Sequence, residues 1–367
     1  MAVASMTASL PVMLDHFEGA PNARLFVPLI VTAPALMIAL LGTFAGRLVD
    51  KVGRRKPLIA ACLLYGVAGT MPLAFESLVV IVILRLVLGV AEAALITISV
   101  TLIADYWDER GRRFWLTVQG VSAPFLSSAI IAMSGYLAAW MWNGVFSLYF
   151  IAFPLALACW LALPEPERAA PIETAESVTP PAILPLMALM LFATVVTAIL
   201  FYVWIVQGGL AFRAVGVMSP ARQGEIFALA HLAVIGGSLL FALSGRWLDP
   251  RRQSAFMLSI MASGMVVIGL AHNEATMIAG LVIEQVGAGM SVLCLMAWAF
   301  RLLPETVRGA GTGAFAACFF AGQFVSPLLF AGSGFLLEGV LDRFVLFGAM
   351  GLGCAGLLLL ARRPNPS

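Results

Sequence analysis

The eleven residues Gly46–Lys56, GRLVDKVGRRK, stand between two long apolar stretches and combine glycines, one carboxylate and five basic side chains. The first five of them recur 199 positions later as GRWLD, Gly245–Asp249, again followed by basic residues. Two further pairs repeat at an offset of 198: Arg110-Gly111 with Arg308-Gly309, and Arg24 with Arg222. Three matches in nearly the same register predict that the chain consists of two similar halves.

The composition predicts what these halves are made of. Of 367 residues, 62% are hydrophobic and only 11% are charged, and the mean hydropathy is +1.01. Soluble domains contain about 45–50% apolar and about 25% charged residues, so a soluble enzyme is excluded. Because a membrane-spanning helix needs about 20 apolar residues, we expect an all-α polytopic membrane protein. Eleven full spans are predicted: 25–46, 57–75, 77–101, 114–137, 142–163, 182–206, 222–245, 253–271, 275–300, 309–333 and 341–361.

A shorter apolar run precedes the eleven spans, over residues 1–14. At 1.5 Å per residue, a helix of this length covers about 21 Å of a hydrocarbon core of about 30 Å. We therefore interpret it as the second half of a first spanning helix, truncated at its N-terminus. With that helix, the chain is predicted to form two bundles of six helices each.

The segment between the bundles has a different composition, since it is rich in proline and glutamate and lacks apolar periodicity. Such a segment is typical of a solvated linker. The predicted organisation is an N-terminal bundle over 1–163, a cytoplasmic linker over 164–181, a C-terminal bundle over 182–361 and a cytoplasmic tail over 362–367.

The basic residues predict the orientation in the membrane. Of the 21 Lys and Arg residues, 16 lie at one set of loops, four at the other, and Arg85 lies inside a span. Cytoplasmic loops carry the excess of Lys and Arg, so the 16-residue side and the C-terminus are expected to be cytoplasmic. The four residues on the opposite side are Arg24, Arg213, Arg222 and Arg343.

The loop at Gly46–Lys56 resembles the signature G-x-L-x-D-x-x-G-R-R/K of the major facilitator superfamily, and the second copy at Gly245–Asp249 resembles its weaker repeat. The resemblance implies two parallel six-helix repeats that alternate in opening a central site to each side. It also implies a cytoplasmic latch. The expected latch residues are Gly46, Asp50, Gly53, Arg54, Arg55 and, as a partner at the end of the fourth helix, Asp105. The alternative is that this loop is only a basic membrane anchor.

Three ionisable residues inside spans are candidates for proton coupling or substrate binding: Arg85, Glu92 and Glu284. Charged residues at membrane depth are costly and usually face a cavity. The run from Arg85 to Gly89 resembles the family's helix-4 signature R-x-x-x-G, which is associated with proton-linked members. The repeat offset of 199 maps Arg85 onto Glu284, which predicts similar depths on opposite walls of the cavity. The alternative is that each group is neutralised inside its own bundle.

Polar and aromatic residues in the seventh and tenth helices are candidates for lining the central cavity. Their residue types suit an apolar or aromatic solute, although packing or lipid-facing aromatics would give the same pattern. Around Pro124, the fifth helix resembles the family's antiporter signature only weakly, which is little evidence for antiport. The cavity candidates are Tyr202, Trp204, Gln207, Gln285 and Trp298.

These features predict a secondary active transporter, resembling the drug or sugar efflux branch, that exports a small organic solute in exchange for protons. The alternatives are a proton symporter or facilitator importing an organic acid or sugar, and a transporter-like membrane sensor. We expect no enzyme activity, no cofactor, no metal and no nucleic-acid partner, and no nucleotide motif is present. The expected state is a monomer among membrane lipids, in a bacterial inner membrane.

Overall fold

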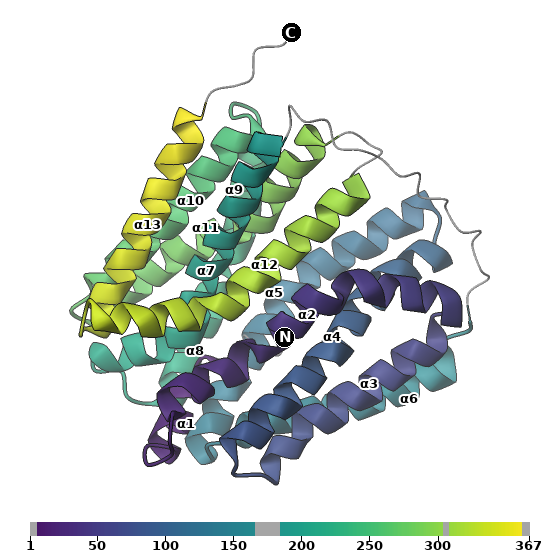
Figure 1. Ribbon diagram of the computed structural model, residues 1–367, viewed down its shortest axis with the longest axis horizontal. Coiled ribbons are helices and arrows are strands. Elements are labelled where there is room, and N and C mark those ends of the chain that lie inside the picture. The colour runs from purple at the N-terminus through teal and green to yellow at the C-terminus, as the bar shows by residue number, and fades with distance from the viewer. Residues whose placement is uncertain (1–5, 166–183, 304–307, 362–367) are drawn as a thin grey trace. The chain divides into compact units, whose positions relative to one another are not determined.

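A computed structural model describes residues 6–165, 184–303 and 308–361, with side chains except those of 43–52, 100, 104 and 308–310. Every regular element among these residues is a helix (Figure 1). The first group contains α1 (Leu10–His16), α2 (Ala23–Val52), α3 (Arg55–Thr70), the 3₁₀ turn η2 (Met71–Leu73), α4 (Leu78–Tyr106), α5 (Glu109–Trp140), the 3₁₀ segment η3 (Gly144–Ile151) and α6 (Ala152–Ala162).

The second group of helices follows the linker. It contains α7 (Leu184–Ala214), α8 (Pro220–His231), α9 (Ala233–Ser244), α10 (Pro250–Gly269), α11 (Glu274–Leu302), α12 (Arg308–Gly332), the 3₁₀ turn η6 (Ser333–Phe335) and α13 (Val340–Leu360). Local capping explains two of the starts. Asp249 accepts a hydrogen bond from Arg252 N at 3.1 Å before α10, and Asn273 accepts one from Thr276 N at 2.9 Å before α11. Such side-chain caps satisfy amides that a helix start leaves open.

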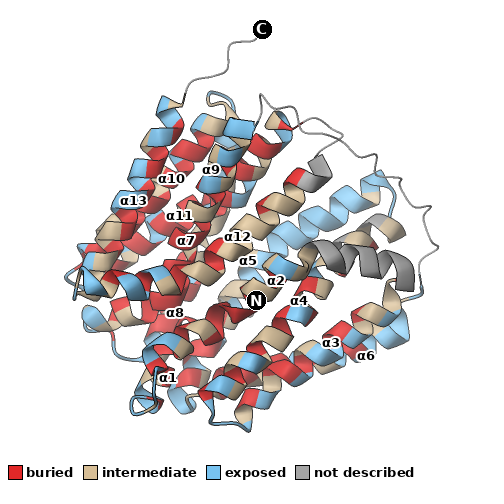
Figure 2. Cartoon of the chain, viewed as in Figure 1, coloured by how far each residue is buried: buried red, intermediate tan, exposed pale blue. Residues whose placement is uncertain are grey.

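The prediction of a polytopic all-α membrane protein is confirmed. Within the described ranges, 11 helical segments are long and apolar enough to cross a membrane. Their surfaces expose many large apolar side chains, including Trp140 and Trp247, each 78% exposed, and Leu161, 70% exposed. Figure 2 colours each described residue by its burial and shows exposed positions along most helices. A water-soluble monomer rarely exposes apolar patches on this scale, whereas lipid would cover them.

The helices form two compact units, which we describe separately. The N-terminal unit contains α1–α6 and also residues 219–224, while the C-terminal unit contains α7, the rest of α8 and α9–α13. In the C-terminal unit α10 packs along both α11 and α13, and α7 packs against α12.

Glycines bring α10 and α11 into close backbone contact. A Cβ atom at Gly264 would lie 2.4 Å from Glu284 N, and one at Gly280 would lie 2.7 Å from Ile268 N. Small residues matter at such places because helices in a membrane associate through close packing rather than through exclusion of water. Glu284 is therefore held on a helix whose backbone has little freedom to shift.

Two spans predicted as single helices are interrupted. The span at 142–163 begins as 3₁₀ helix over η3, and Pro154, which has no N–H, cannot bond the Phe150 carbonyl as an α-helix would require. The span at 222–245 breaks between α8 and α9. There Leu232 N bonds Leu229 O at 3.2 Å and Ile235 N bonds Leu232 O at 3.0 Å, the shorter spacing of a 3₁₀ turn.

Candidate functional site

The C-terminal unit contains a chain of three polar side chains. Glu284 and Gln285, adjacent on α11, are both fully buried. Gln285 Nε2 donates to Glu284 Oε2 at 2.7 Å, and Gln285 Oε1 lies 2.8 Å from His231 Nδ1. Because an amide oxygen only accepts hydrogen bonds, His231 Nδ1 is the donor in this arrangement. Only the fold connects His231, through Gln285, to Glu284.

The second oxygen of Glu284 distinguishes this carboxyl group from a fully paired one. Glu284 Oε1 is buried and has no hydrogen-bond partner among the residues that the structure describes. An ionised carboxylate is costly in such surroundings unless both oxygens are paired, and taking up a proton removes the cost. The arrangement can therefore hold a proton and release it when the surroundings change.

The break between α8 and α9 lies directly after His231, the residue that bonds Gln285. His231 is the last residue of α8 and is partly exposed. Beyond the break, α9 touches α11 directly: a Cβ atom at Gly237 would approach the Val286 carbonyl oxygen, and one at Gly289 the Val234 carbonyl oxygen, each to 2.1 Å. The contacts fix the register between α9 and α11 beside Gln285.

The N-terminal unit buries a charge of the opposite sign. Arg85 on α4 is fully buried; its Nε donates to the Ile30 carbonyl oxygen at 2.8 Å and its Nη1 donates to Tyr149 Oη at 2.6 Å. The guanidinium carbon also lies 5.3 Å from the centre of the Tyr149 ring, within the range of a cation–π contact. Arg85 thus binds two other elements of its own unit, α2 and η3.

A proline explains why the Ile30 carbonyl accepts this bond. In an α-helix that carbonyl would bond the N–H of residue 34, which is Pro34 and has none. Arg85 supplies the missing donor. One turn later on α4, a Cβ atom at Gly89 would lie 2.6 Å from the Pro34 carbonyl oxygen, so only glycine lets α4 approach α2 this closely. The R-x-x-x-G pattern therefore fits the proline segment of α2.

Glu92, the third candidate, lies two turns beyond Arg85 on α4. Its Oε2 is buried without a hydrogen-bond partner in the described part of the chain. Two tyrosines, Tyr65 and Tyr149, lie in the same unit as Glu92. The two tyrosines contact each other, with ring centres 5.2 Å apart, and line an apolar cavity of about 480 Å³ inside the N-terminal unit.

The described end of the signature loop, Gly53–Arg55, makes polar contacts with Asp105 and Glu165. Gly53 has φ of +100°, which favours glycine. Arg54 Nε donates to Asp105 Oδ2 at 2.9 Å, and these two side chains are 14% and 16% exposed. Glu165 accepts from Arg54 N at 2.6 Å and from Arg55 N at 3.2 Å, so its carboxylate sits at the start of α3. Gly46 and Asp50 lie in α2, and the Asp50 side chain is outside the described ones.

Glu165 is a contact that the sequence analysis missed. It lies in the predicted linker, yet it binds the signature loop 110 residues earlier in the chain. Tyr106, whose hydroxyl donates to the Pro164 carbonyl, strengthens the same attachment. A glutamate in a proline-rich segment carries no pattern that would have revealed this contact.

The Arg54–Asp105 pair leads to a first prediction. Replacing Asp105 by Asn removes a charge-assisted bond between two largely buried groups, and we expect a loss of about 1 kcal/mol in the free energy of unfolding. We also expect cysteines placed in the signature loop to react faster with a water-soluble maleimide. The matched control is Glu109→Gln, because the Glu109–Arg113 pair is 86% and 78% exposed and should contribute little. Equal reactivity in both variants would contradict a closing role for the pair.

The aromatic and amide candidates divide into two environments. Trp204 is fully buried and makes edge-to-face contacts with Phe212, Phe227 and Phe344 inside the C-terminal unit, which is a packing position. Tyr202 and Gln207 on α7 are 8% and 4% exposed.

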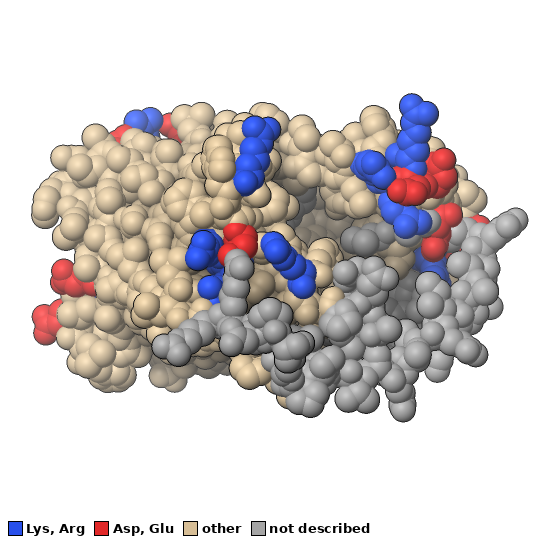
Figure 3. Space-filling model, turned by 90° about the horizontal axis from the view of Figure 1, so that it is seen from above, with Lys and Arg blue, Asp and Glu red and all other residues tan. Residues whose placement is uncertain are grey.

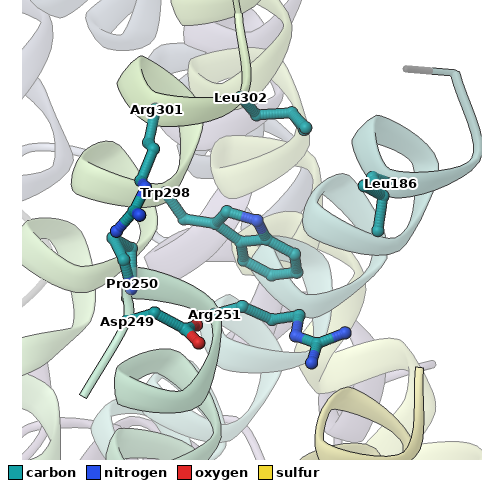
Figure 4. Close-up of a pocket in the computed structure, with 7 residues that line it drawn as sticks. All are labelled: Leu186, Asp249, Pro250, Arg251, Trp298, Arg301 and Leu302. Carbon is teal, nitrogen blue, oxygen red and sulfur yellow. The ribbon is translucent and has the colours of Figure 1, made fainter. Parts of the chain in front are cut away.

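Trp298 lies near the last turn of α11 and lines a pocket of about 270 Å³, shown in Figure 4. Its neighbours there are charged and apolar residues from three parts of the C-terminal unit: Leu186, Asp249, Pro250, Arg251, Arg301 and Leu302.

The helices and their exposed apolar surfaces define a multi-pass integral membrane protein. The family model of the Major Facilitator Superfamily matches residues 1–327. The chain belongs to this superfamily of transporters. No curated protein sequence matches the chain.

Solved structures show the same fold. A D-xylose–proton symporter is 17% identical and superposes with a TM-score of 0.77, covering 98% of this chain and 93% of the other. The inward-open xylose transporter XylE from E. coli is 14% identical with a TM-score of 0.75, covering 100% and 93%. The human organic anion transporter MFSD10 (TETRAN) is 16% identical with a TM-score of 0.65, covering 96% and 89%. At these identities the likeness concerns the fold.

Proposed function

We propose that this chain is a proton-coupled transporter of a small organic solute, in which Glu284 carries the proton. The observation that supports this most directly is the buried Glu284 carboxyl group with one oxygen unpartnered among the described residues. At 1.5 Å per residue, Glu284 lies about 15 Å along α11 from Glu274, roughly half of the hydrocarbon core. A group at that depth is reached in turn from both sides if the protein alternates between two open states.

The other candidates take different parts in the proposal. Gln285 and His231 orient the carboxyl group, and Tyr202 and Gln207 are candidates for contacting the solute. Arg85 has a packing role, because its guanidinium is committed to the Ile30 carbonyl and to Tyr149. In this proposal Glu284 corresponds to Arg85 in the repeat but differs from it in function.

The two bundles at 1–163 and 182–361 would alternate around the site, with the linker at 164–181 between them and the C-terminus in the cytoplasm of a bacterial cell. Asp50, Arg54 and Asp105 would close the cytoplasmic side. Efflux by proton exchange is the first candidate. Symport is the second, and the fold likeness to a D-xylose–proton symporter favours considering it.

Proteoliposomes with an imposed pH gradient test the proposal and separate its two forms. The purified protein is offered a panel of labelled sugars, organic anions and lipophilic cations. Uptake driven by an acidic exterior indicates symport, and uptake driven by an acidic interior indicates exchange. If a solute crosses at the same rate with and without the gradient, and does not accumulate, the protein is a facilitator and proton coupling is wrong.

A further inference from the structure

None of the residues that line the pocket around Trp298 takes part in the proposed transport cycle. It is framed by the start of α7, the start of α10 and the end of α11. Figure 4 shows the Trp298 indole in the middle, with Arg301 on one side and Arg251 on the other. Two cations from different helices therefore bracket one buried aromatic ring.

The charge of this pocket is positive on balance. Its single carboxylate, Asp249, is already engaged, since it caps α10 at Arg252 N and lies 3.7 Å from Arg252 Nε. Arg301 is exposed and forms no ion pair with any residue that the structure describes. Arg251 donates one N–H group to the Ala361 carbonyl at the end of α13. A guanidinium has five N–H donors, so others can bind an anion in the pocket. An anion entering here would meet two guanidinium groups.

The pocket also has an apolar lining, which favours a ligand with an apolar part. Trp298, only 5% exposed, and the leucines at 186 and 302 give it an apolar lining. The pocket lies where the spans of α7, α10 and α11 end, on the side rich in Lys and Arg. Figure 3 shows basic side chains gathered on this face. Tryptophan and arginine at the end of a span lie at headgroup depth, where basic pockets hold anionic lipid headgroups.

We propose that this pocket binds an anionic phospholipid, with the phosphate held by Arg251 and Arg301 and the glycerol backbone against Trp298. A guanidinium presents paired N–H donors that match the geometry of phosphate oxygens. A surface anchor that follows the positive-inside rule would need neither the concave shape nor the apolar lining. The occupied pocket joins α7, α10 and α11, so the lipid stabilises the C-terminal unit.

Thermal unfolding of the delipidated protein in neutral detergent tests this proposal. We expect titration with phosphatidylglycerol to raise the melting temperature saturably, and phosphatidylcholine to raise it less. In the double variant Arg251→Gln/Arg301→Gln, phosphatidylglycerol should bind about tenfold more weakly. The matched control is Arg110→Gln/Arg246→Gln, which removes two exposed charges from the side rich in Lys and Arg but leaves the pocket lining and the Asp249–Arg252 pair intact.

Each arm of the experiment has an outcome that overturns the proposal. An equal loss of affinity in the control variant would mean that the lipid senses only the net charge of this end. Equal stabilisation by inorganic phosphate would indicate a soluble anion site instead. If loss of the Arg251–Ala361 contact unfolds the double variant, Arg301→Gln alone serves, since its side chain is exposed. Undiminished binding by that single variant would then refute the site.

Discussion

Replacing Glu284 by Gln is expected to abolish accumulation of solute driven by a pH gradient while leaving the protein folded. The amide keeps the shape of the carboxyl group, and its oxygen can still accept the bond from Gln285 Nε2, now 2.7 Å long. It cannot bind or release a proton near neutral pH. Because exchange of solute for solute requires no net proton movement, we expect that exchange to continue in the variant.

The measurement compares two fluxes in the same proteoliposomes: accumulation under a pH gradient and exchange of labelled for unlabelled solute. The matched control is Glu274→Gln, which makes the same change in the first turn of the same helix. Full gradient-driven accumulation by Glu284→Gln would show that the proton binds elsewhere. Loss of both fluxes with a normal melting temperature would indicate that Glu284 binds the solute.

Replacing Arg85 by Met is expected to destabilise the N-terminal unit, and the size of the effect should depend on Pro34. The substitution leaves the buried Ile30 carbonyl and the Tyr149 hydroxyl without the guanidinium donor, which we expect to cost about 3 kcal/mol. In a Pro34→Ala background, the substituted alanine has an N–H that can bond the Ile30 carbonyl within α2. There the cost of losing Arg85 should fall by about 1–2 kcal/mol.

A double-mutant cycle measures this coupling through the free energy of unfolding of the four proteins. The control is Pro28→Ala, which lies in the same helix but would restore the bond to the Arg24 carbonyl rather than to that of Ile30. It should not reduce the cost of losing Arg85. A coupling energy of zero for Arg85 and Pro34 would contradict the proposed packing role and return Arg85 to the candidates for solute binding.

The predicted spans agree with the structure to within a few residues in most cases, because each depends on local composition. For example, the span predicted at 253–271 is α10 at Pro250–Gly269, and the one at 275–300 is α11 at Glu274–Leu302. A stretch of about 20 apolar residues has one stable arrangement in lipid, since a helix satisfies all its own backbone hydrogen bonds. The break after His231 has no such signal in the composition, whereas Pro154 marks the interruption of the span at 142–163.

The candidate site could be predicted only as a set of residue types. Arg85 and Glu284 were identified by their position inside predicted apolar spans, since ionisable residues within spans are rare. The partners were not identifiable, because they depend on helices that meet in space. Arg85 meets the Ile30 carbonyl 55 residues away, and His231 meets Gln285 54 residues away. Pro34 was a usable signal, since a proline inside a helix always leaves a carbonyl four residues earlier without its donor.

The sequence by itself determined that this chain crosses the membrane many times, that its halves repeat, and that the signature loop places it in its family. All three follow from patterns along the chain, which lipid and the backbone enforce locally. Only the tertiary structure decided which buried charges are satisfied. Arg85 is satisfied by a carbonyl that Pro34 left open, whereas Glu284 keeps one oxygen unpartnered among the described residues. The physical reason is that a buried polar group is stabilised by whatever lies within about 3 Å of it, and only the packing of the helices determines that neighbour.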